Sequence, residues 1–263
     1  MSVFIAKPTD GLVWITGASS GIGRQAALDL AVQGYRVAVS ARRGDELAAM
    51  AAGHAGPGAI LPYPLDLTDR EAVAETVARM IAEHGTIALA FLNVGLFAVD
   101  RKQPFAAENA WKTMEGNVKT VINALDPLIA HMTERGRGQI VINASLSSYI
   151  GLPGAGYYGA SKAALLHLSE TLRAQLIHKG ITVQVVNCGF IETPLTSGAK
   201  FPMPFLMKVD AASRQIVAGM HSGRFEITFP KKLSWMLKAL RLLPYPIALR
   251  LTARAASRSP DRK

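Results

Sequence analysis

Short apolar runs alternate along the chain with longer segments in which apolar residues recur at spacings of three and four. The runs have the length and the flanking turn residues of buried strands, and the longer segments have the period of helices with one buried face. Pro127 lies inside the longest helical segment and predicts a kink there. Strands are predicted at 12–15, 37–39, 60–65, 87–92, 139–144, 182–186 and 224–229, and helices at 23–33, 45–52, 69–84, 108–131 and 158–178.

This alternation predicts the architecture of the protein. Strands joined by helices form right-handed βαβ units, which build a parallel sheet covered on both faces. We therefore expect an α/β protein with a single Rossmann-type, doubly wound parallel sheet of about seven strands and helices on both faces. A length of 263 residues suits one such domain, to which we assign 1–230. Residues 194–222 are expected to form a lid over the ligand, because 194–209 is rich in Pro, Phe and Met.

The amino-acid composition indicates a globular protein and excludes several kinds of site. Hydrophobic residues make up 49% of the chain and charged residues 18%, which is enough apolar material for a large core. The single cysteine, Cys188, excludes an internal disulfide, and the six histidines show no metal-ligand spacing, so we predict no metal. The first ten residues lack the apolar core of a secretory signal, and no apolar run is long enough to span a bilayer. We expect a cytoplasmic protein.

A glycine-rich turn joins the first predicted strand to the first helix, with the sequence Thr16-Gly17-Ala18-Ser19-Ser20-Gly21-Ile22-Gly23. Glycines there allow a tight turn and a close approach of the backbone to a pyrophosphate. The N–H groups and the dipole of the following helix favour phosphate at its N-terminus. The alternative is a tight βα connection without a ligand, but the full βαβ unit that the turn opens favours a nucleotide site.

The end of the second predicted strand indicates which dinucleotide binds. NAD sites commonly present an acid there, which binds the ribose 2′-hydroxyl. Ala41 stands near that position and Arg42 follows it, and a guanidinium can hold a 2′-phosphate with several donors. NADP(H) is therefore favoured over NAD(H), unless Arg42 is only a solvated loop charge. Asp66, after the third strand, could accept a hydrogen bond from the adenine amino group or belong to the N-cap region of the next helix.

Tyr158 and Lys162 are four residues apart in a predicted helix and therefore share one face. An ammonium beside a phenol favours the phenolate, so Lys162 is expected to lower the pKa of Tyr158. Ser145, which follows the fifth predicted strand, could hold a substrate oxygen beside that phenol. Together these groups would move a proton onto or off a carbonyl or an alcohol, although a Tyr–Lys pair by itself is more often a solvated surface pair.

With these motifs in this order, the chain resembles the short-chain dehydrogenase/reductase family over 11–196. The glycine-rich turn at 16–23 matches the family's T-G-x-x-x-G-x-G. Ser145, Tyr158 and Lys162 match the catalytic serine, tyrosine and lysine at the family's spacing. The other matching positions are Asp66, Asn93-Val94-Gly95, Asn117 and the segment from Asn187 to Thr193.

The resemblance implies a role for each matched residue. Tyr158 would act as general acid in reduction and as general base in oxidation, Lys162 would hydrogen-bond the nicotinamide ribose, and Ser145 would hold the substrate oxygen. Asn117 would order a water that relays protons to Lys162. The cofactor-binding residues that the resemblance implies are Gly17, Ser19, Ser20, Gly21, Ile22, Arg42, Asp66, Asn93, Gly95, Tyr158, Lys162, Ile191 and Thr193.

Three positions depart from the family pattern: Leu92 and Val94 in the N-N-A-G motif, and Cys188 in place of the proline of the P-G turn. None of them is a reacting group, so the departures bear on loop rigidity and cofactor affinity rather than on the chemistry. The resemblance also implies a homodimer or a homotetramer.

The basic residues are concentrated at the C-terminus. The chain carries a net charge of +10, and 231–263 contains nine Lys or Arg and one acid, a balance of +8. From Lys231 to Leu243 apolar residues follow a helical stripe, with Trp235 near its start, and 247–254 resumes the pattern. Such a basic amphipathic extension can lie in a membrane interface, dock on its own domain or dock on a second subunit. No recognised nucleic-acid-binding module accompanies the charge, so no nucleic-acid partner is expected.

These observations predict an NADP(H)-dependent oxidoreductase that interconverts a small ketone or aldehyde and the corresponding alcohol. A lipophilic substrate is expected because Phe190, Ile191, Leu195 and 201–207 supply an apolar wall, although these residues could equally pack the lid onto the body. Two other classes of function remain open: a nucleotide-binding scaffold or sensor without turnover, and a peripheral membrane protein that acts through its basic tail. The intact set of serine, tyrosine and lysine argues against a pure binding protein.

Overall fold

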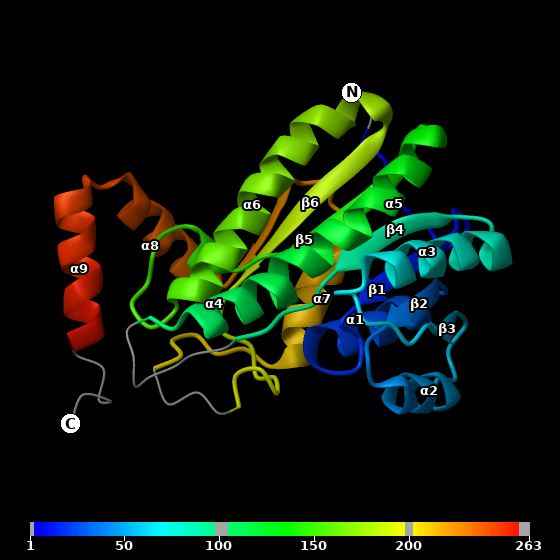
Figure 1. Ribbon diagram of the computed structural model, residues 1–263, viewed down its shortest axis with the longest axis horizontal. Coiled ribbons are helices and arrows are strands. Elements are labelled where there is room, and N and C mark those ends of the chain that lie inside the picture. The colour runs from blue at the N-terminus through cyan, green and yellow to red at the C-terminus, as the bar shows by residue number, and fades with distance from the viewer. Residues whose placement is uncertain (1–2, 98–104, 198–201, 258–263) are drawn as a thin grey trace.

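The computed structural model describes residues 3–97, 105–197 and 202–257. The strands within these residues form one parallel sheet in the order β3-β2-β1-β4-β5-β6-β7 (Figure 1). This order confirms the predicted doubly wound α/β fold and places a topological switch between β1 and β4. The strands are β1 (Leu12–Thr16), β2 (Arg36–Ser40), β3 (Ala59–Pro62), β4 (Ile87–Leu92), β5 (Gly138–Asn143), β6 (Ile181–Cys188) and β7 (Glu226–Phe229).

Helices cover both faces of this sheet and connect its strands (Figure 1). Four of the five helices predicted between 23 and 178 agree with the structure to within a few residues, and the longest predicted one differs. The structure adds a helix at Val209–Met220, inside the predicted lid, where no helix was expected. The helices are α1 (Gly21–Val32), α2 (Gly44–Ala52), α3 (Arg70–His84), α4 (Ala107–Met114), α5 (Thr120–Glu134), α6 (Gly156–Leu176), α7 (Val209–Met220), α8 (Lys231–Leu242) and α9 (Tyr245–Ser257).

The core consists of two layers separated by the sheet, and β1 shows how the sequence builds both. Successive side chains of a strand point to opposite faces. Val13 and Ile15 therefore pack with the buried residues of α1, α2 and α7, whereas Leu12 and Trp14 pack with those of α3, α5 and α6. All four side chains are fully buried. This double burial explains why the strand reads as a continuous apolar run rather than as an alternating one.

The segment predicted as one helix over 108–131 differs from the prediction. The structure divides it into α4 and α5, which are joined by a π-helical turn at Glu115–Lys119. Pro127 lies within α5, and the π-helical turn around Asn117 is a separate irregularity that the sequence did not predict. A π-turn inserts one extra residue into a helix and often marks a functional position.

The sheet geometry brings the predicted motifs together. In an open parallel sheet, ligands bind outside the carboxyl ends of the strands at the switch in strand order. The turn after β1 and the loop after β4 flank that switch, and Ser145 follows β5 at the same edge. Residues 187–193 leave the end of β6, where Ile191 forms an isolated bridge with Met207.

Candidate active site

The turn between β1 and α1 has the backbone conformation that its glycines permit. Gly17 and Gly21 have φ values of +66° and +56°, in the left-handed region. A Cβ atom at Gly23 would lie 2.5 Å from the carbonyl oxygen of Gly17, so only glycine allows the helix to begin so close to the turn. The three glycines therefore fold the backbone tightly over the carboxyl end of β1.

The N-terminus of α1 fits an anionic phosphate. Ser20 occupies the N-cap position without a side-chain hydrogen bond to the helix, and the first turn contains no acidic residue. The orphan N–H groups and the positive end of the helix dipole therefore remain available to a ligand. By contrast, α3 is capped internally, because the Asp69 carboxylate accepts from the Ala72 N–H.

Thr193 faces the glycine turn from the segment after β6. A Cβ atom at Gly21 would lie 3.2 Å from the Thr193 Cγ2 atom, so the two residues border the same narrow space. Ile191, two residues earlier, is buried and bonded to the lid through the Met207 bridge. The predicted cofactor residues at 191 and 193 thus approach the predicted phosphate site from the far side of the switch. Ser19, Ser20 and Ile22 lie in the turn and the first turn of α1 between them.

The arginines after β2 are divided between two environments. Arg43 donates to the Ser19 hydroxyl at 2.8 Å and pairs with Glu46 at 2.8 Å, so it closes over the glycine turn. Arg42 is exposed, and its charge helps to lower the pKa of Asp66. The 2′-phosphate role that the sequence assigns to Arg42 stays a prediction, and Arg43 is a second cation at the same corner that the sequence argument did not use.

Asp66 is not the cap of α3. Its Oδ1 atom accepts from the Thr68 N–H at 2.9 Å and from the Thr68 hydroxyl at 2.8 Å. These two hydrogen bonds are the main reason that the pKa of Asp66 is lowered. Asp69 is the N-cap residue itself, and Asp66 shapes the turn that leads into it, so its place in the N-cap region is compatible with the structure and its contact with adenine remains a prediction.

Asn93 holds the loop after β4 against the glycine turn. Its N–H donates to the Thr16 hydroxyl at 3.0 Å, and its side-chain amide lies 3.4 Å from the Gly17 carbonyl oxygen. Its Oδ1 atom accepts from the Asn143 amide at 2.8 Å. Asn93 therefore ties together the ends of β1, β4 and β5. Gly95 lies two residues further on, and a Cβ atom there would lie 3.7 Å from the Lys162 Nζ atom, so this loop approaches Lys162.

The structure brings Ser145, Tyr158 and Lys162 together, as their spacing predicts. Ser145 begins the short helix Leu146–Ser148, and its hydroxyl accepts from the Ser147 N–H at 3.2 Å. Tyr158 and Lys162 lie on the first two turns of α6, and the Lys162 Nζ atom is 5.7 Å from the centre of the Tyr158 ring. A hydrogen bond with Ser145 acts on the Tyr158 phenol. The three side chains thus come from two elements that meet at the carboxyl edge of the sheet.

The pKa of Tyr158 shifts in the direction opposite to the one expected from the sequence. Burial raises the pKa of Tyr158 above its usual value, negative charge on Cys188 would raise it further, and the hydrogen bond with Ser145 lowers it. Burial also lowers the pKa of Lys162, to about 8. The expectation that the ammonium dominates is therefore wrong for the chain alone, because desolvation outweighs it. Tyr158 is held as a neutral phenol at pH 7, the form that a general acid needs.

Lys162 is a buried cation with a defined partner. Its side chain is 2% exposed, and its Nζ atom donates to the Asn143 carbonyl oxygen at 2.8 Å. That carbonyl is a functional group that the sequence argument missed, because a main-chain acceptor leaves no signature in residue type. Cys188 lies beside the same cluster, and burial raises the pKa of its thiol to about 11, so it remains a thiol at neutral pH.

Asn117 is fully buried in the π-helical turn and binds protein groups on two sides. Its Oδ1 atom accepts from the Leu96 N–H at 2.6 Å, and its amide donates to the Leu96 carbonyl at 3.0 Å and to the Ser161 hydroxyl at 2.8 Å. Asn117 thereby connects the loop after β4 with α6, one residue from Lys162. Its predicted role in ordering a water stays a prediction.

One apolar side chain contacts Tyr158 directly, and others are exposed in the segment after β6. Phe97 packs edge-on against the Tyr158 ring, with centroids 5.1 Å apart, a neighbour that the sequence argument did not identify. Of the predicted apolar wall, Leu195, Phe205 and Leu206 are 41%, 50% and 45% exposed. Phe201 of the predicted wall lies outside the described residues. The apolar surface of the lid is therefore incompletely covered by the body.

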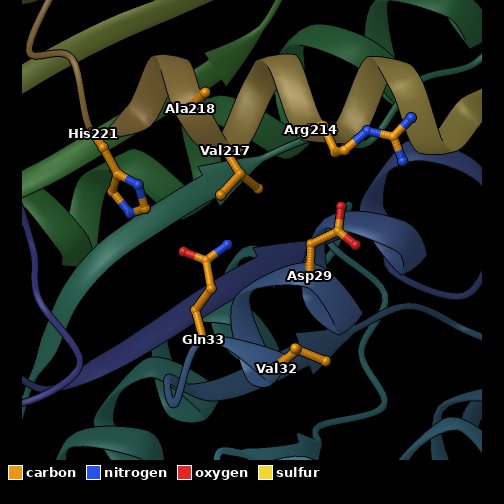
Figure 2. Close-up of a pocket in the computed structure, with 7 residues that line it drawn as sticks. All are labelled: Asp29, Val32, Gln33, Arg214, Val217, Ala218 and His221. Atoms are coloured by element: carbon orange, nitrogen blue, oxygen red, sulfur yellow. The ribbon is translucent and has the colours of Figure 1, made fainter.

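A separate surface hollow of about 420 Å³ lies between α1 and α7 (Figure 2). It is at the end of α1 remote from the glycine turn, so it is distinct from the candidate active site. Figure 2 shows its polar side chains on both helices, and the Asp29 carboxylate accepts from Ser213 at 2.6 Å. The hollow is lined by Asp29, Val32, Gln33, Arg214, Val217, Ala218 and His221.

Comparison with known proteins identifies the class. Residues 11–201 match the family model for short chain dehydrogenases, so the chain belongs to the short-chain dehydrogenase/reductase family and is an oxidoreductase of that family. An uncharacterized oxidoreductase of Myxococcus xanthus is 34% identical over 234 residues, which are 89% of this chain and 92% of that protein.

Two further relatives carry more specific descriptions. The 3-oxoacyl-[acyl-carrier-protein] reductase FabG of Thermotoga maritima is 34% identical over 186 residues, 69% of this chain and 74% of that protein. A short chain dehydrogenase from Burkholderia cenocepacia, solved in complex with NADP, has a TM-score of 0.79 at 25% identity and covers 94% of this chain and 99% of its own.

Proposed function

We propose that this protein is an NADP(H)-dependent oxidoreductase that interconverts a small lipophilic ketone or aldehyde and the corresponding alcohol. The observation that carries the proposal is the meeting of Ser145, Tyr158 and Lys162 beside an uncapped, glycine-lined helix N-terminus. A dinucleotide bound at that N-terminus would supply hydride transfer. The protein's own contribution is to orient the substrate and to move one proton.

In the direction of reduction, Tyr158 donates its phenolic proton to the substrate oxygen as the carbon receives hydride. The raised pKa keeps that proton on the phenol until transfer. The Ser145 hydroxyl shares the developing negative charge on the substrate oxygen, and Lys162 places a positive charge beside the resulting phenolate. In oxidation the same groups act in reverse, and Tyr158 accepts the proton.

Preference for NADP(H) is supported by the two arginines after β2. Neither Ala41 nor its neighbours at 40–43 supply the acid that would bind a ribose 2′-hydroxyl. Arg42 is exposed there, and Arg43 already donates to Ser19 in the glycine turn. Two solved relatives, from Burkholderia cenocepacia and Sphingobium yanoikuyae, are described as complexes with NADP and NADPH.

A lipophilic carbonyl substrate is supported by the apolar surroundings of Tyr158. Phe97 lies against the phenol, and Leu195, Phe205 and Leu206 expose apolar surface on the lid. The Thermotoga maritima relative is described as a 3-oxoacyl-[acyl-carrier-protein] reductase. A 3-oxoacyl group carries a ketone on an acyl chain, so it is a lipophilic carbonyl compound. Assembly as a homodimer or homotetramer, an expectation taken from the family, and a cytoplasmic location, an expectation taken from the sequence, belong to the same proposal.

The experiment that tests the proposal compares Tyr158→Phe with Tyr157→Phe. Turnover of lipophilic ketones is followed by the absorbance of the reduced nicotinamide, and NADPH binding is measured separately. We expect Tyr158→Phe to retain NADPH binding and to lose about 10²- to 10⁴-fold in kcat, because the ring stays and the acid is removed.

Tyr157 is the matched control, since its ring packs on Phe105 and its hydroxyl accepts from the Ala106 N–H rather than from the catalytic group. Its variant should keep kcat within a few-fold of the parent chain. Full activity of Tyr158→Phe would refute the assignment, and dinucleotide binding without turnover on any carbonyl would favour a binding protein.

A further inference from the structure

The C-terminal helices carry a one-sided charge. Residues 231–257 contain six basic side chains and no acid, and five of the six are exposed, at 231, 232, 241, 250 and 254. The sixth, Lys238, is paired with Glu226 of β7. These two helices therefore contain no acidic side chain of their own to offset their basic ones.

Helix α8 is apolar on two opposite sides. Leu233 and Leu237 are buried against Leu146, Tyr149 and Ile150 of the segment after β5. On the opposite side, Trp235, Ala239 and Leu242 are spaced by four and three residues and form a second stripe. Trp235 is 70% exposed and Leu242 is 86% exposed. Docking on the protein's own domain therefore accounts for one face of α8 and leaves the other without a partner among the described residues.

Helix α9 also exposes large apolar side chains. Among the described side chains of this helix, only the small ones of Ala248 and Thr252 are almost fully buried. Its large apolar side chains remain outside, where Tyr245 is 68% exposed and Leu249 is 54% exposed. Arg250 and Arg254 are exposed on the same helix. A helix that buries small side chains and exposes leucines and a tyrosine leaves apolar surface in contact with water. Such a surface indicates a binding site for a partner.

The position of these helices makes the surface accessible. In Figure 1, α8 and α9 form one end of the molecule, opposite the end that carries α2 and β3. Within the described part of the chain, no helix has both the length and the apolar character to cross a bilayer. Contact with a membrane would therefore lie in the plane of its interface, with the apolar stripe inserted and the basic residues among the headgroups.

We propose that the C-terminal face, defined as the exposed side chains Lys231, Lys232, Trp235, Arg241, Leu242, Tyr245, Leu249, Arg250 and Arg254, binds the surface of an anionic lipid bilayer. Charge selects this occupant: lipid phosphates and anionic headgroups complement an acid-free basic face, and Trp and Tyr are suited to the interface. A second copy of the chain is disfavoured, because a symmetric contact would bring this face against an identical positive one.

The test uses the full chain and vesicles of phosphatidylcholine, with or without phosphatidylglycerol. We expect co-sedimentation with the anionic vesicles, little with the neutral ones, and release when salt is raised from about 0.05 M to about 0.5 M. No pelleting with anionic vesicles at low salt, or equal pelleting with both kinds, would overturn the proposal.

Two pairs of substitutions locate the binding face. Trp235→Ser with Leu242→Ser removes the apolar stripe, and Lys231→Glu with Lys232→Glu reverses the charge at its start. Each pair should weaken binding to anionic vesicles about tenfold or more. If the serine pair fails to fold, as judged by circular dichroism, the charge-reversal pair carries the test, since both lysines are exposed.

Matched controls separate this face from surface chemistry in general. Trp111→Ser removes a tryptophan that is 71% exposed on α4, and Lys112→Glu with Lys179→Glu makes the same change in net charge on exposed residues elsewhere. Both controls should bind vesicles like the parent chain, with the mass of every variant checked by light scattering. Equal loss in the controls, or a change of mass that accounts for lost binding, would remove the proposal in favour of protein–protein contact.

Discussion

Two adjacent arginines stand at the corner where a 2′-phosphate would bind, and they differ in what already holds them. Arg43 is engaged by Ser19 and Glu46, whereas Arg42 extends into solvent near Asp66. A side chain that already bridges the glycine turn supports the turn whichever dinucleotide binds. We therefore expect Arg42 to discriminate between the cofactors and Arg43 to affect both.

The corresponding prediction compares Arg42→Ala with Arg43→Ala. Arg42→Ala should weaken NADPH binding about 10- to 100-fold and NADH binding by about twofold or less, as loss of a hydrogen-bonded charge contact implies. Arg43→Ala should weaken both cofactors to a similar extent. Dissociation constants from fluorescence titration of each variant decide the matter, and selectivity in Arg43→Ala instead would reassign the 2′-phosphate contact to that residue.

For single residues, the spacing along the chain was enough to predict which side chains meet in the site. It was not enough to predict how the fold buries them or what they bind. The interval from Tyr158 to Lys162 is a property of any helix, so the pairing could be read directly. The pKa direction of Tyr158 depends on burial, and the acceptor for Lys162 is the main-chain carbonyl of Asn143. Residue type does not indicate how deeply a side chain is buried or where a main-chain carbonyl points, so the sequence could not predict either feature.

A polar link connects α8 to the strand and the loop beneath it. Glu226 of β7 accepts from Lys238, from the Tyr149 hydroxyl and, at 2.8 Å, from the Asn187 amide. Burial by itself would raise the pKa of Glu226, but the hydrogen bonds from these three partners lower it below its usual value of 4.5. Tyr149 lies four residues after Ser145, so this link also supports the segment that carries Ser145.

Because the pKa of Glu226 is lower in the folded chain than in the unfolded chain, its contribution to stability is present above about pH 4.5. The contribution disappears as pH falls through the folded pKa. Lys238→Met should therefore reduce the free energy of unfolding by about 1–2 kcal/mol at pH 7, and by less near pH 3. Urea unfolding at the two pH values measures this difference.

The matched control is Arg70→Met. Arg70 likewise joins two separate elements, α3 and α5, through an ion pair with Asp126 at 2.9 Å, but both side chains of this pair are largely exposed. We expect a change of about 0.5 kcal/mol or less at pH 7 for this variant. A cost at Lys238 that is no larger than the one at Arg70, or that does not depend on pH, would contradict the role assigned to Glu226.

Element boundaries could be predicted where local chemistry sets them. Asp69 caps α3 and glycines follow several helices, so these ends fell within a few residues of expectation. The π-turn at 115–119 could not be found in this way, because its stabilising contacts come from the Leu96 backbone and from Ser161, which are distant in sequence. Tertiary hydrogen bonds of one buried asparagine thus override the regular helical period.

For the whole molecule, the order of elements was sufficient to predict the sheet, because right-handed βαβ connections leave few topologies open. The arrangement of the C-terminal helices was not predictable in the same way. Their sequence is compatible with docking and with an exposed surface, and the structure shows both at once, with Leu237 buried and Trp235 exposed on one helix. An amphipathic pattern with two apolar stripes does not reveal which stripe meets the body.

The stability of the whole chain should respond to cofactor through the glycine turn. A ligand at about 100 times its dissociation constant adds about 2.7 kcal/mol to the free energy of unfolding, which corresponds to a rise in Tm of roughly 5–10 °C for a chain of this size. We expect this rise with NADPH and a smaller one with NADH at the same concentration, measured by thermal unfolding.

A comparison of Gly21→Ala with Gly34→Ala separates an effect on the predicted phosphate site from the general cost of alanine at a positive φ. Both glycines have positive φ, +56° and +90°, so each substitution should lower the Tm of the free chain through a backbone cost of about 1–2 kcal/mol. A Cβ atom at Gly34 meets nothing within 4 Å, whereas one at Gly21 projects toward Thr193 across the predicted phosphate site. Gly34→Ala should therefore keep the NADPH-dependent rise in Tm, and Gly21→Ala should lose most of it. A full rise in both variants would mean that the dinucleotide does not bind over this turn.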